Sequence, residues 1–183
     1  FYNCDGFKGQ LNLPKNIEKI GNGAFGFCSG FTEKLNIPSG VKSIGDFAFK
    51  NCTGFSGVLS FPEALTSIGS SAFCNCKGFS GDLTITKNVW LIGSYAFCNC
   101  SGFTGSLVIS DSVVEMGTCA FSNCTGFSGK LTLSKNIKNI FSYTFYNCSH
   151  FTGNLILPEE AKSIGSYAFF NCTGFTGDLT IPN

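Results

Sequence analysis

The sequence is poor in charge, has a single histidine and contains no long apolar run. Charged residues make up 13% of the 183, and the formal net charge is +1, so no overall field would attract nucleic acid or an anionic membrane. With His150 as the only histidine, neither a histidine-dependent triad nor any other catalytic residue is expected. No run of about 18 apolar residues predicts a membrane span. These absences argue against an enzyme, a nucleic-acid-binding protein and direct membrane insertion.

What the sequence has instead is a repeat of 24 residues that runs from one end to the other. Counting copy 1 from Phe1, repeat positions 1 and 7 are Phe in all eight copies and position 11 is always Leu. A fixed period takes precedence over the domain count that length would suggest, and it indicates a solenoid. Position 4 is always cysteine, at Cys4, Cys28, Cys52, Cys76, Cys100, Cys124, Cys148 and Cys172.

Each copy contains one segment with strand character. Positions 11 to 13 alternate apolar and polar residues, as in Leu83-Thr84-Ile85, which predicts short strands that stack into a parallel sheet with a rise of about 5 Å per copy. In five copies the next residue is proline, which has no amide proton and ends the pairing. These prolines are Pro14, Pro38, Pro62, Pro158 and Pro182.

The remaining positions predict corners. Position 21 is Gly in six of seven copies, and position 3 is Asn in seven of eight, which indicates bends. The segment after the glycine, such as 94–97, would form a helical or 3₁₀ turn. We therefore predict a repeat solenoid with a parallel sheet of short strands on one side and turns or short 3₁₀ or helical segments on the other. Residues 1–183 would form a single array of about 7.6 repeats.

Residues 35–52 contain the most complete copy of the motif, Leu-x-Ile-Pro-x-x-Val-x-x-Ile-Gly-x-x-Ala-Phe-x-Asn-Cys. This pattern resembles the leucine-rich repeat of the BspA-like type. The Gly-Phe-Thr-Gly at 102–105 departs from the usual form, because it is one residue longer and has Phe where Leu is common. The resemblance implies a curved leucine-rich-repeat solenoid of the kind found on surface proteins of host-associated bacteria and protists such as trichomonads. Such arrays are thought to mediate adhesion, and the family pattern includes no catalytic residue.

The cysteines allow a structural and a chemical interpretation. Because two Phe flank each position-4 cysteine at fixed spacing, these residues are expected to be small buried hydrophobes. Cys74 and Cys98 share position 2 in consecutive copies, and a separation of about 5 Å falls within the Cα range of a disulfide. Parallel neighbours can also point their sulfurs in the same direction, so a disulfide stays an open alternative. Cys119 has no such partner.

Neither a metal ion nor a cofactor is predicted. Cys-x-Cys pairs occur only at 74/76 and 98/100, and burial of the position-4 thiols would leave too few ligands for a tetrahedral site. The run Gly21-Asn22-Gly23-Ala24-Phe25-Gly26 matches a dinucleotide-binding fingerprint by letter but lacks the βαβ context that gives the motif its meaning.

Asparagine at position 3 also begins a glycosylation sequon in several copies. Since Asn3 and Asn75 keep their place without a Ser or Thr two residues later, we favour a turn role over glycan attachment. The asparagines within sequons are Asn51, Asn99, Asn123, Asn147 and Asn171.

Positions 10 and 12, with position 14 at the strand end, should point outward by strand alternation. Side chains at position 10 vary most while core positions scarcely change, which fits either selection for binding or neutral drift. Mixed signs argue against a phosphate track, so a protein or glycan ligand fits this face better. Aromatic residues at position 23 predict either a second exposed row or half-buried packing. The candidate ligand face comprises Lys34, Asn36, Val58, Ser60, Asp82, Thr84, Ser106, Val108, Lys130, Thr132, Asn154 and Ile156.

Two functions from different classes remain. The first is a non-enzymatic binding or adhesion module at a cell surface or secreted from the cell. The alternative is a structural scaffold in the cytoplasm, for example one attached to the cytoskeleton, because buried free thiols are typical of a reducing compartment. The chain begins and ends within a repeat, so we expect a segment of a longer array whose targeting signals, anchor and caps lie elsewhere.

Overall fold

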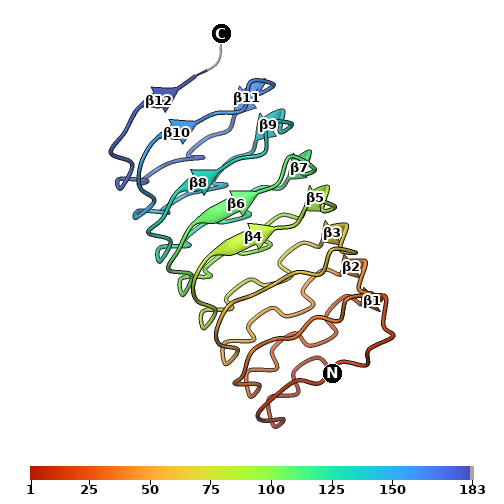
Figure 1. Ribbon diagram of the computed structural model, residues 1–183. Coiled ribbons are helices and arrows are strands. Elements are labelled where there is room, and N and C mark those ends of the chain that lie inside the picture. The colour runs from red at the N-terminus through yellow and green to blue at the C-terminus, as the bar shows by residue number, and fades with distance from the viewer. Residues whose placement is uncertain (182–183) are drawn as a thin grey trace.

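The chain coils once for each 24-residue copy, and the coils stack from the N-terminus to the C-terminus (Figure 1). The computed structural model describes residues 1–181, so Pro182 lies outside the described residues. Residues that pair between neighbouring coils are 24 apart, as in Leu83 with Leu107 and Ile44 with Ile68. Within the described range, no helix has the length and apolar character needed to cross a bilayer. The predicted solenoid is confirmed.

The side of the coils formed by positions 11 to 13, here called the strand side, carries the predicted parallel strands. The two longest, β4 and β6, are followed by Thr86 and Ser110, which keep the amide proton that proline lacks. In the first three copies this segment forms no strand, and the coils are joined there only by isolated bridges just before it, such as Gly9 with Phe31. The strands are β4 (Leu83–Ile85), β6 (Leu107–Ile109) and β8 (Leu131–Thr132) in one sheet, and β10 (Leu155–Ile156) and β12 (Leu179–Thr180) in another.

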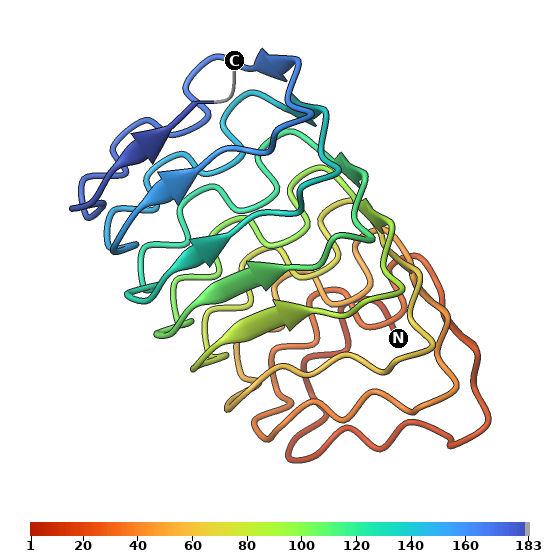
Figure 2. The ribbon, with the colours of Figure 1, turned by 45° about the horizontal axis from the view of Figure 1, so that its top comes forward.

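A second row of parallel strands lies at positions 19 and 20, on another side of the coil (Figure 2). The sequence does not predict these strands, because two residues are too few to show alternation. The first sheet contains β1 (Lys19–Ile20), β2 (Ser43–Ile44), β3 (Ser67–Ile68), β5 (Leu91–Ile92) and β7 (Glu115–Met116), and the second contains β9 (Asn139–Ile140) and β11 (Ser163–Ile164).

The side formed by position 22 of each copy through position 3 of the next is here called the turn side. It consists of turns, and the described residues contain no helix there. In residues 94–97 the amides alternate between two uses: Ala96 N closes a turn to Gly93 O, while Phe97 N donates to Ala120 O of the next coil at 2.7 Å. Tyr95 and Asn99 have positive φ values of 59° and 61°, which end any right-handed helical run. The bends predicted at the position-3 asparagines are therefore present. The helical or 3₁₀ turn predicted for segments such as 94–97 is wrong, because these residues form non-helical turns.

The core consists of two ladders of phenylalanine with a ladder of cysteine between them. Phe97 stacks on Phe73 and Phe121 at ring-centroid distances of 5.4 and 5.1 Å, and position 7 forms a parallel ladder. The position-4 thiols are buried as predicted in the interior coils. Each also donates a hydrogen bond to a carbonyl of the preceding coil, such as Cys100 Sγ to Phe73 O at 3.0 Å. The thiol thus satisfies a buried acceptor, a role that its burial alone did not predict.

Both rows of strands are interrupted once, and each interruption lies where a repeated glycine is replaced. A Cβ on a position-6 glycine would meet carbonyls of the preceding coil, as at Gly126, and one on a position-21 glycine would meet a backbone amide, as at Gly117. His150 replaces the position-6 glycine where β8 fails to pair with β10, and Phe141 replaces the position-21 glycine where β7 fails to pair with β9. We infer that the added side chains hold these coils apart.

This inference makes a prediction for His150→Gly. The backbone amides of Leu83 and Leu107 each donate a hydrogen bond to a carbonyl of the next coil. The equivalent hydrogen bond, from the Leu131 amide to the Asn154 carbonyl, is missing among residues 1–181. We expect the substitution to restore that hydrogen bond. Since such a hydrogen bond contributes about 0.5–1.5 kcal/mol, hydrogen exchange at the Leu131 amide should slow roughly two- to tenfold. The Leu107 amide serves as the control and should not change. An unchanged rate at Leu131 would contradict the spacing role of His150.

Candidate ligand-binding face

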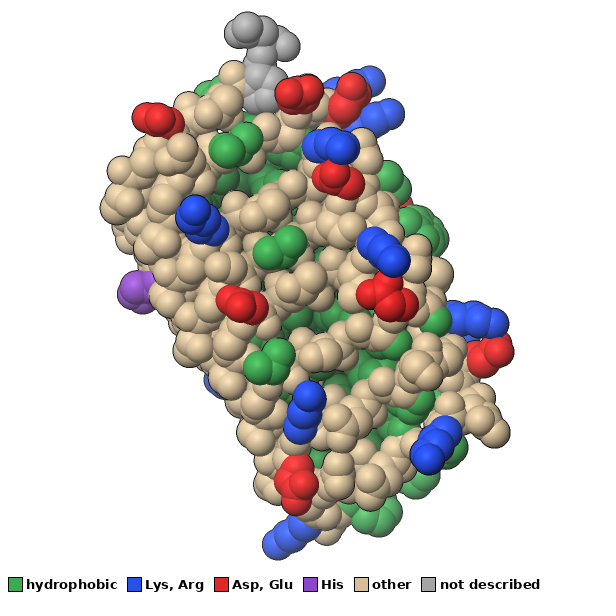
Figure 3. Space-filling model, viewed as in Figure 1, with side chains coloured by type: hydrophobic (Ala, Val, Ile, Leu, Met, Phe, Trp, Pro, Cys, Tyr) green, Lys and Arg blue, Asp and Glu red, His purple; other side chains and the backbone are tan. Residues whose placement is uncertain are grey.

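The predicted ligand face is open to solvent along the strand side. Its backbone belongs to β4, β6, β8 and β10 and to the equivalent segments of the earlier coils. In Figure 3 the face is mostly polar and uncharged, with single charged and hydrophobic side chains spaced along it. Ser106 and Val108 are half-buried. The exposed residues are Lys34, Asn36, Val58, Ser60, Asp82, Thr84, Lys130, Thr132, Asn154 and Ile156.

Some position-10 side chains are fixed by the next coil. Asp82 Oδ1 accepts a hydrogen bond from Ser106 N at 2.6 Å, and Asn154 Oδ1 accepts one from Asp178 N at 3.1 Å. Lys34 and Lys130 make no ion pair within residues 1–181. Sequence reasoning missed this division, although short acceptor side chains at one position could have indicated it. The two lysines are therefore the charges of this face that the next coil does not hold, whereas the negatively charged Asp82 is fixed by its hydrogen bond.

Shallow hollows indent the strand side of the described chain, and two of them lie between neighbouring coils at opposite ends of the array. One lies between β8 and β10, where pairing is interrupted, has a volume of about 290 Å³ and is lined by Leu131, Thr132 and Ile156 with Lys135 and Glu159 at its edge. The other has the same volume and lies between the first two coils. It is lined by Leu11, Asn12, Leu13, Lys15, Asn36, Ile37, Pro38 and Ser39. A hollow of this size holds a side chain or a sugar ring rather than a whole ligand.

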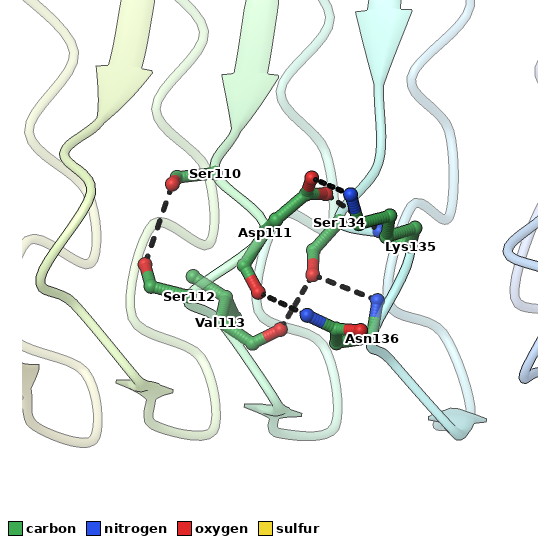
Figure 4. Close-up of polar contacts among 7 residues, drawn as sticks. All are labelled: Ser110, Asp111, Ser112, Val113, Ser134, Lys135 and Asn136. Atoms are coloured by element: carbon green, nitrogen blue, oxygen red, sulfur yellow. Dashed lines mark hydrogen bonds and ion pairs between the residues drawn. The ribbon is translucent and has the colours of Figure 1, made fainter.

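A row of paired charges at position 15 borders the face. Lys87 Nζ lies 3.4 Å from Glu63 Oε2, and Lys135 Nζ lies 2.9 Å from Asp111 Oδ2 (Figure 4). Hydrogen bonds from the Lys135 backbone amide and ammonium lower the pKa of the Asp111 carboxyl, and Asp111 in turn raises the pKa of Lys135. The alternating signs at 24-residue spacing could have predicted this row. Because these charges neutralise one another, they add little attraction for a ligand.

The corner beside this row corrects the prediction for position 14. Ser134 is fully buried, donating to Val113 O at 2.6 Å and accepting from Asn136 N at 3.2 Å (Figure 4). Pro158 is buried as well. In these two copies position 14 turns into the coil, because the chain bends there and buried backbone carbonyls need donors. Pro14 is exposed, and the other described position-14 residues are half-buried.

The eleven cysteines are free thiols, Cys74 and Cys98 included. Burial raises the pKa of the core thiols, to about 12 for Cys52. In the described part of the chain, no group of three or more His, Cys, Asp or Glu is arranged to hold a metal ion. Cys74 and Cys98 lie near the surface of the turn side, away from the ligand face.

The sequon asparagines form part of a side-chain ladder. Asn75 Nδ2 donates to Asn51 Oδ1 at 2.6 Å, and Asn147 and Asn171 donate in the same way to Asn123 and Asn147. All have positive φ values near 60°, including Asn99. In Asn147 and Asn171 the amide nitrogen that would carry a glycan is thus a hydrogen-bond donor within the array.

Position 23 forms a second row on the turn side. Phe47, Tyr95, Tyr143 and Tyr167 are between 38% and 55% exposed, and Tyr143 stacks on Tyr167 at 5.2 Å. Stacking along the array leaves mainly ring edges toward solvent. Both predicted descriptions, an exposed row and half-buried packing, therefore apply to it.

The chain is similar to known proteins over its whole length. A leucine-rich repeat protein from Bacteroides ovatus is 26% identical, with 97% of this chain and 56% of that chain covered and a TM-score of 0.74. The T. pallidum leucine-rich repeat protein is 25% identical, with 90% and 76% covered and a TM-score of 0.76. The pneumococcal vaccine antigen PcpA shares the fold at 20% identity, with 96% and 51% covered and a TM-score of 0.58. The chain thus spans little more than half the length of the first structure.

No curated protein matches the chain. A six-copy model of the BspA-type leucine-rich repeat region matches residues 1–104 and residues 79–183, and together these matches include every residue. Since that match agrees with the register of the coils, the chain belongs to the BspA-type leucine-rich repeat family.

Proposed function

We propose that the chain is a non-enzymatic adhesion module whose strand side binds a protein or glycan at a cell surface. The observation that carries the proposal is the contrast between the two kinds of charge on this side. Four charges of position 15 are paired, Lys87 with Glu63 and Lys135 with Asp111. Lys34 and Lys130 extend from the face without an ion-pair partner in the described chain. Solvent-exposed charges of this kind steer a ligand and set its orientation.

The fold supports a binding role in a second way. The hydrogen bonds between coils hold the outward positions in fixed register, as between β4 and β6, so the face is organised before a ligand arrives. Preorganisation lowers the entropy cost of association, and repeat arrays use extended faces in this manner. BspA-like arrays are also associated with adhesion at cell surfaces, which is the basis for the proposed location.

The test is a double variant, Lys34→Gln with Lys130→Gln. The probes are a printed array of neutral and acidic glycans and a panel of purified extracellular proteins. We expect binding to at least one probe, and a loss of roughly tenfold in affinity in the variant, as two contacts of about 0.7 kcal/mol each would give. The matched control is Lys8→Gln with Lys77→Gln, which removes the same charge from two exposed lysines at repeat positions 8 and 5, outside the residues of the face. Equal binding by both variants would contradict the proposed face, and binding to no probe would contradict the adhesion role.

The free thiols favour one alternative, a structural scaffold in a reducing compartment. Mass spectrometry of native material separates the two functions. Glycan mass at any of the sequons would support the cell surface, whereas an unglycosylated chain with all eleven thiols reduced would support the scaffold.

A further inference from the structure

Three of the eleven cysteines lie outside repeat position 4, on the turn side of neighbouring coils. Cys74 and Cys98 are each 8% exposed and Cys119 is 9% exposed, while Cys76 and Cys100 on the same coils are completely buried. This residual exposure gives a small oxidant such as hydrogen peroxide a route to the three residues. The position-4 thiols of the interior coils have no such route.

Cys74 and Cys98 are held side by side by the backbone. The amides on either side of Cys74, those of Phe73 and Asn75, each donate at 2.8 Å to carbonyls of the next coil, and the second of these carbonyls belongs to Cys98. Neighbouring parallel chains lie about 5 Å apart, inside the Cα range of a disulfide. Each thiol is also the main influence on the pKa of the other, as expected of two neighbouring sulfurs. Little movement is therefore needed to join their sulfurs.

The surroundings give the two thiols different roles. The neighbouring Cys98 thiol is the main reason why the pKa of Cys74 is lowered to about 7, and the charge of Lys50, at the same position on the preceding coil, lowers it further. Lys50 Nζ lies over the Phe47 ring at 5.4 Å. Cys74 in turn raises the pKa of Cys98, which keeps its proton while Cys74 is ionised. Cys74 is thus the thiol that reacts with the oxidant, and Cys98 is the thiol that then attacks the oxidised Cys74.

We propose that Cys74 and Cys98 form an oxidation-sensitive dithiol that closes into a disulfide between two coils when it meets a hydroperoxide. The Cys74 thiolate attacks one peroxide oxygen, so that an S–O bond forms, the O–O bond breaks and the released hydroxide takes up a proton to become water. The Cys98 sulfur then attacks the sulfenic sulfur of Cys74. The S–S bond forms as the S–O bond breaks, and the leaving hydroxide takes the Cys98 proton as the second water. This site is independent of the strand side and of the ligand proposed for it.

Cys119 provides a control within the same surface. It lies at position 23, beside the Tyr95 phenol, whose pKa is raised chiefly by the Cys119 thiol. Position 23 and position 2 lie three residues apart in the chain, so Cys119 is not in register with either member of the pair. We expect it to stay a thiol when the pair is oxidised.

The test is to treat the native chain with hydrogen peroxide, alkylate the remaining thiols, and assign the linked peptides by fragmentation in a mass spectrometer. We expect a link between Cys74 and Cys98 with the loss of two hydrogen atoms, retained in Cys119→Ser. In Cys98→Ser the reaction should stop at a sulfenic acid on Cys74, which dimedone captures. Lys50→Gln should slow the oxidation of Cys74 several-fold. A link to another cysteine, or separate over-oxidation of the two, would overturn the proposal.

A second measurement needs no variant. A trivalent phenylarsenical bridges two neighbouring thiols, and we expect the untreated, folded chain to bind one equivalent, with binding abolished after peroxide treatment. A native chain that binds none would show that the two sulfurs do not meet, and would overturn the proposal as well.

Discussion

Replacing Phe97 with alanine should lower the free energy of unfolding by about 3–5 kcal/mol, the usual cost of removing a buried aromatic ring. The ring is fully buried and lies between Phe73 and Phe121 in the position-1 ladder, with Phe61 at its edge. Its neighbours cannot collapse into the gap, because their backbones are held at 24-residue spacing by bonds such as Phe97 N to Ala120 O. The cost includes the cavity and also the loss of two stacked ring pairs, each of which contributes about 0.5–1.5 kcal/mol.

Urea denaturation followed by circular dichroism measures this effect. The matched control is Trp90→Ala, which removes an aromatic ring that is 47% exposed and should change the stability by less than about 1 kcal/mol. A similar loss in the two variants would mean that the phenylalanine ladder does not determine the stability of the array. Because long repeat arrays can unfold in parts, the shape of the transition should be compared as well as its midpoint.

The repeat period made most of the core predictable. Phe97 and Cys100 could be assigned to the interior because their types never change at positions 1 and 4, and the structure buries both. The strand at 83–85 was also predictable, since its alternation is visible in three residues. The strands at position 19 were not, because a two-residue strand such as Ser67–Ile68 leaves no periodic signal and depends on pairing with its neighbours.

The helical alternative on the turn side failed for a related reason. Sequence propensities describe hydrogen bonds within one copy, whereas the Phe97 amide bonds to the next copy and Tyr95 adopts a left-handed conformation. The same limit applies to the ligand face. The exposure of Asp82 was predictable from strand alternation. The hydrogen bond that its side chain accepts from the Ser106 amide depends on the distance between coils. Features that depend on the stacking of copies are absent from the sequence of any one copy.

The glycines set that stacking distance, and this leads to the second large effect. Gly102→Ala would place a Cβ 2.1 Å from Lys77 O and 2.4 Å from Phe79 O, two backbone carbonyls of the preceding coil. Neither can move without shifting the whole coil, so we expect a loss of about 1–3 kcal/mol in the free energy of unfolding. Gly102 does not have a positive φ, so close approach is the reason for the cost and backbone strain is not.

The matched control is Gly6→Ala, which changes the same repeat position at a site with no atom within 4 Å of the added Cβ in this chain. There the substitution should be neutral or stabilise the protein by about 0.4–1 kcal/mol, because alanine restricts the unfolded chain. Urea denaturation of both variants gives the comparison. If Gly102→Ala costs no more than Gly6→Ala, coil spacing is not set by glycine, and the interruption beside His150 needs another cause. If the difference appears, a side chain at repeat position 6 is tolerated against a preceding coil only where the hydrogen bonds between the two strands are lost. The boundary between β8 and β10 is such a place.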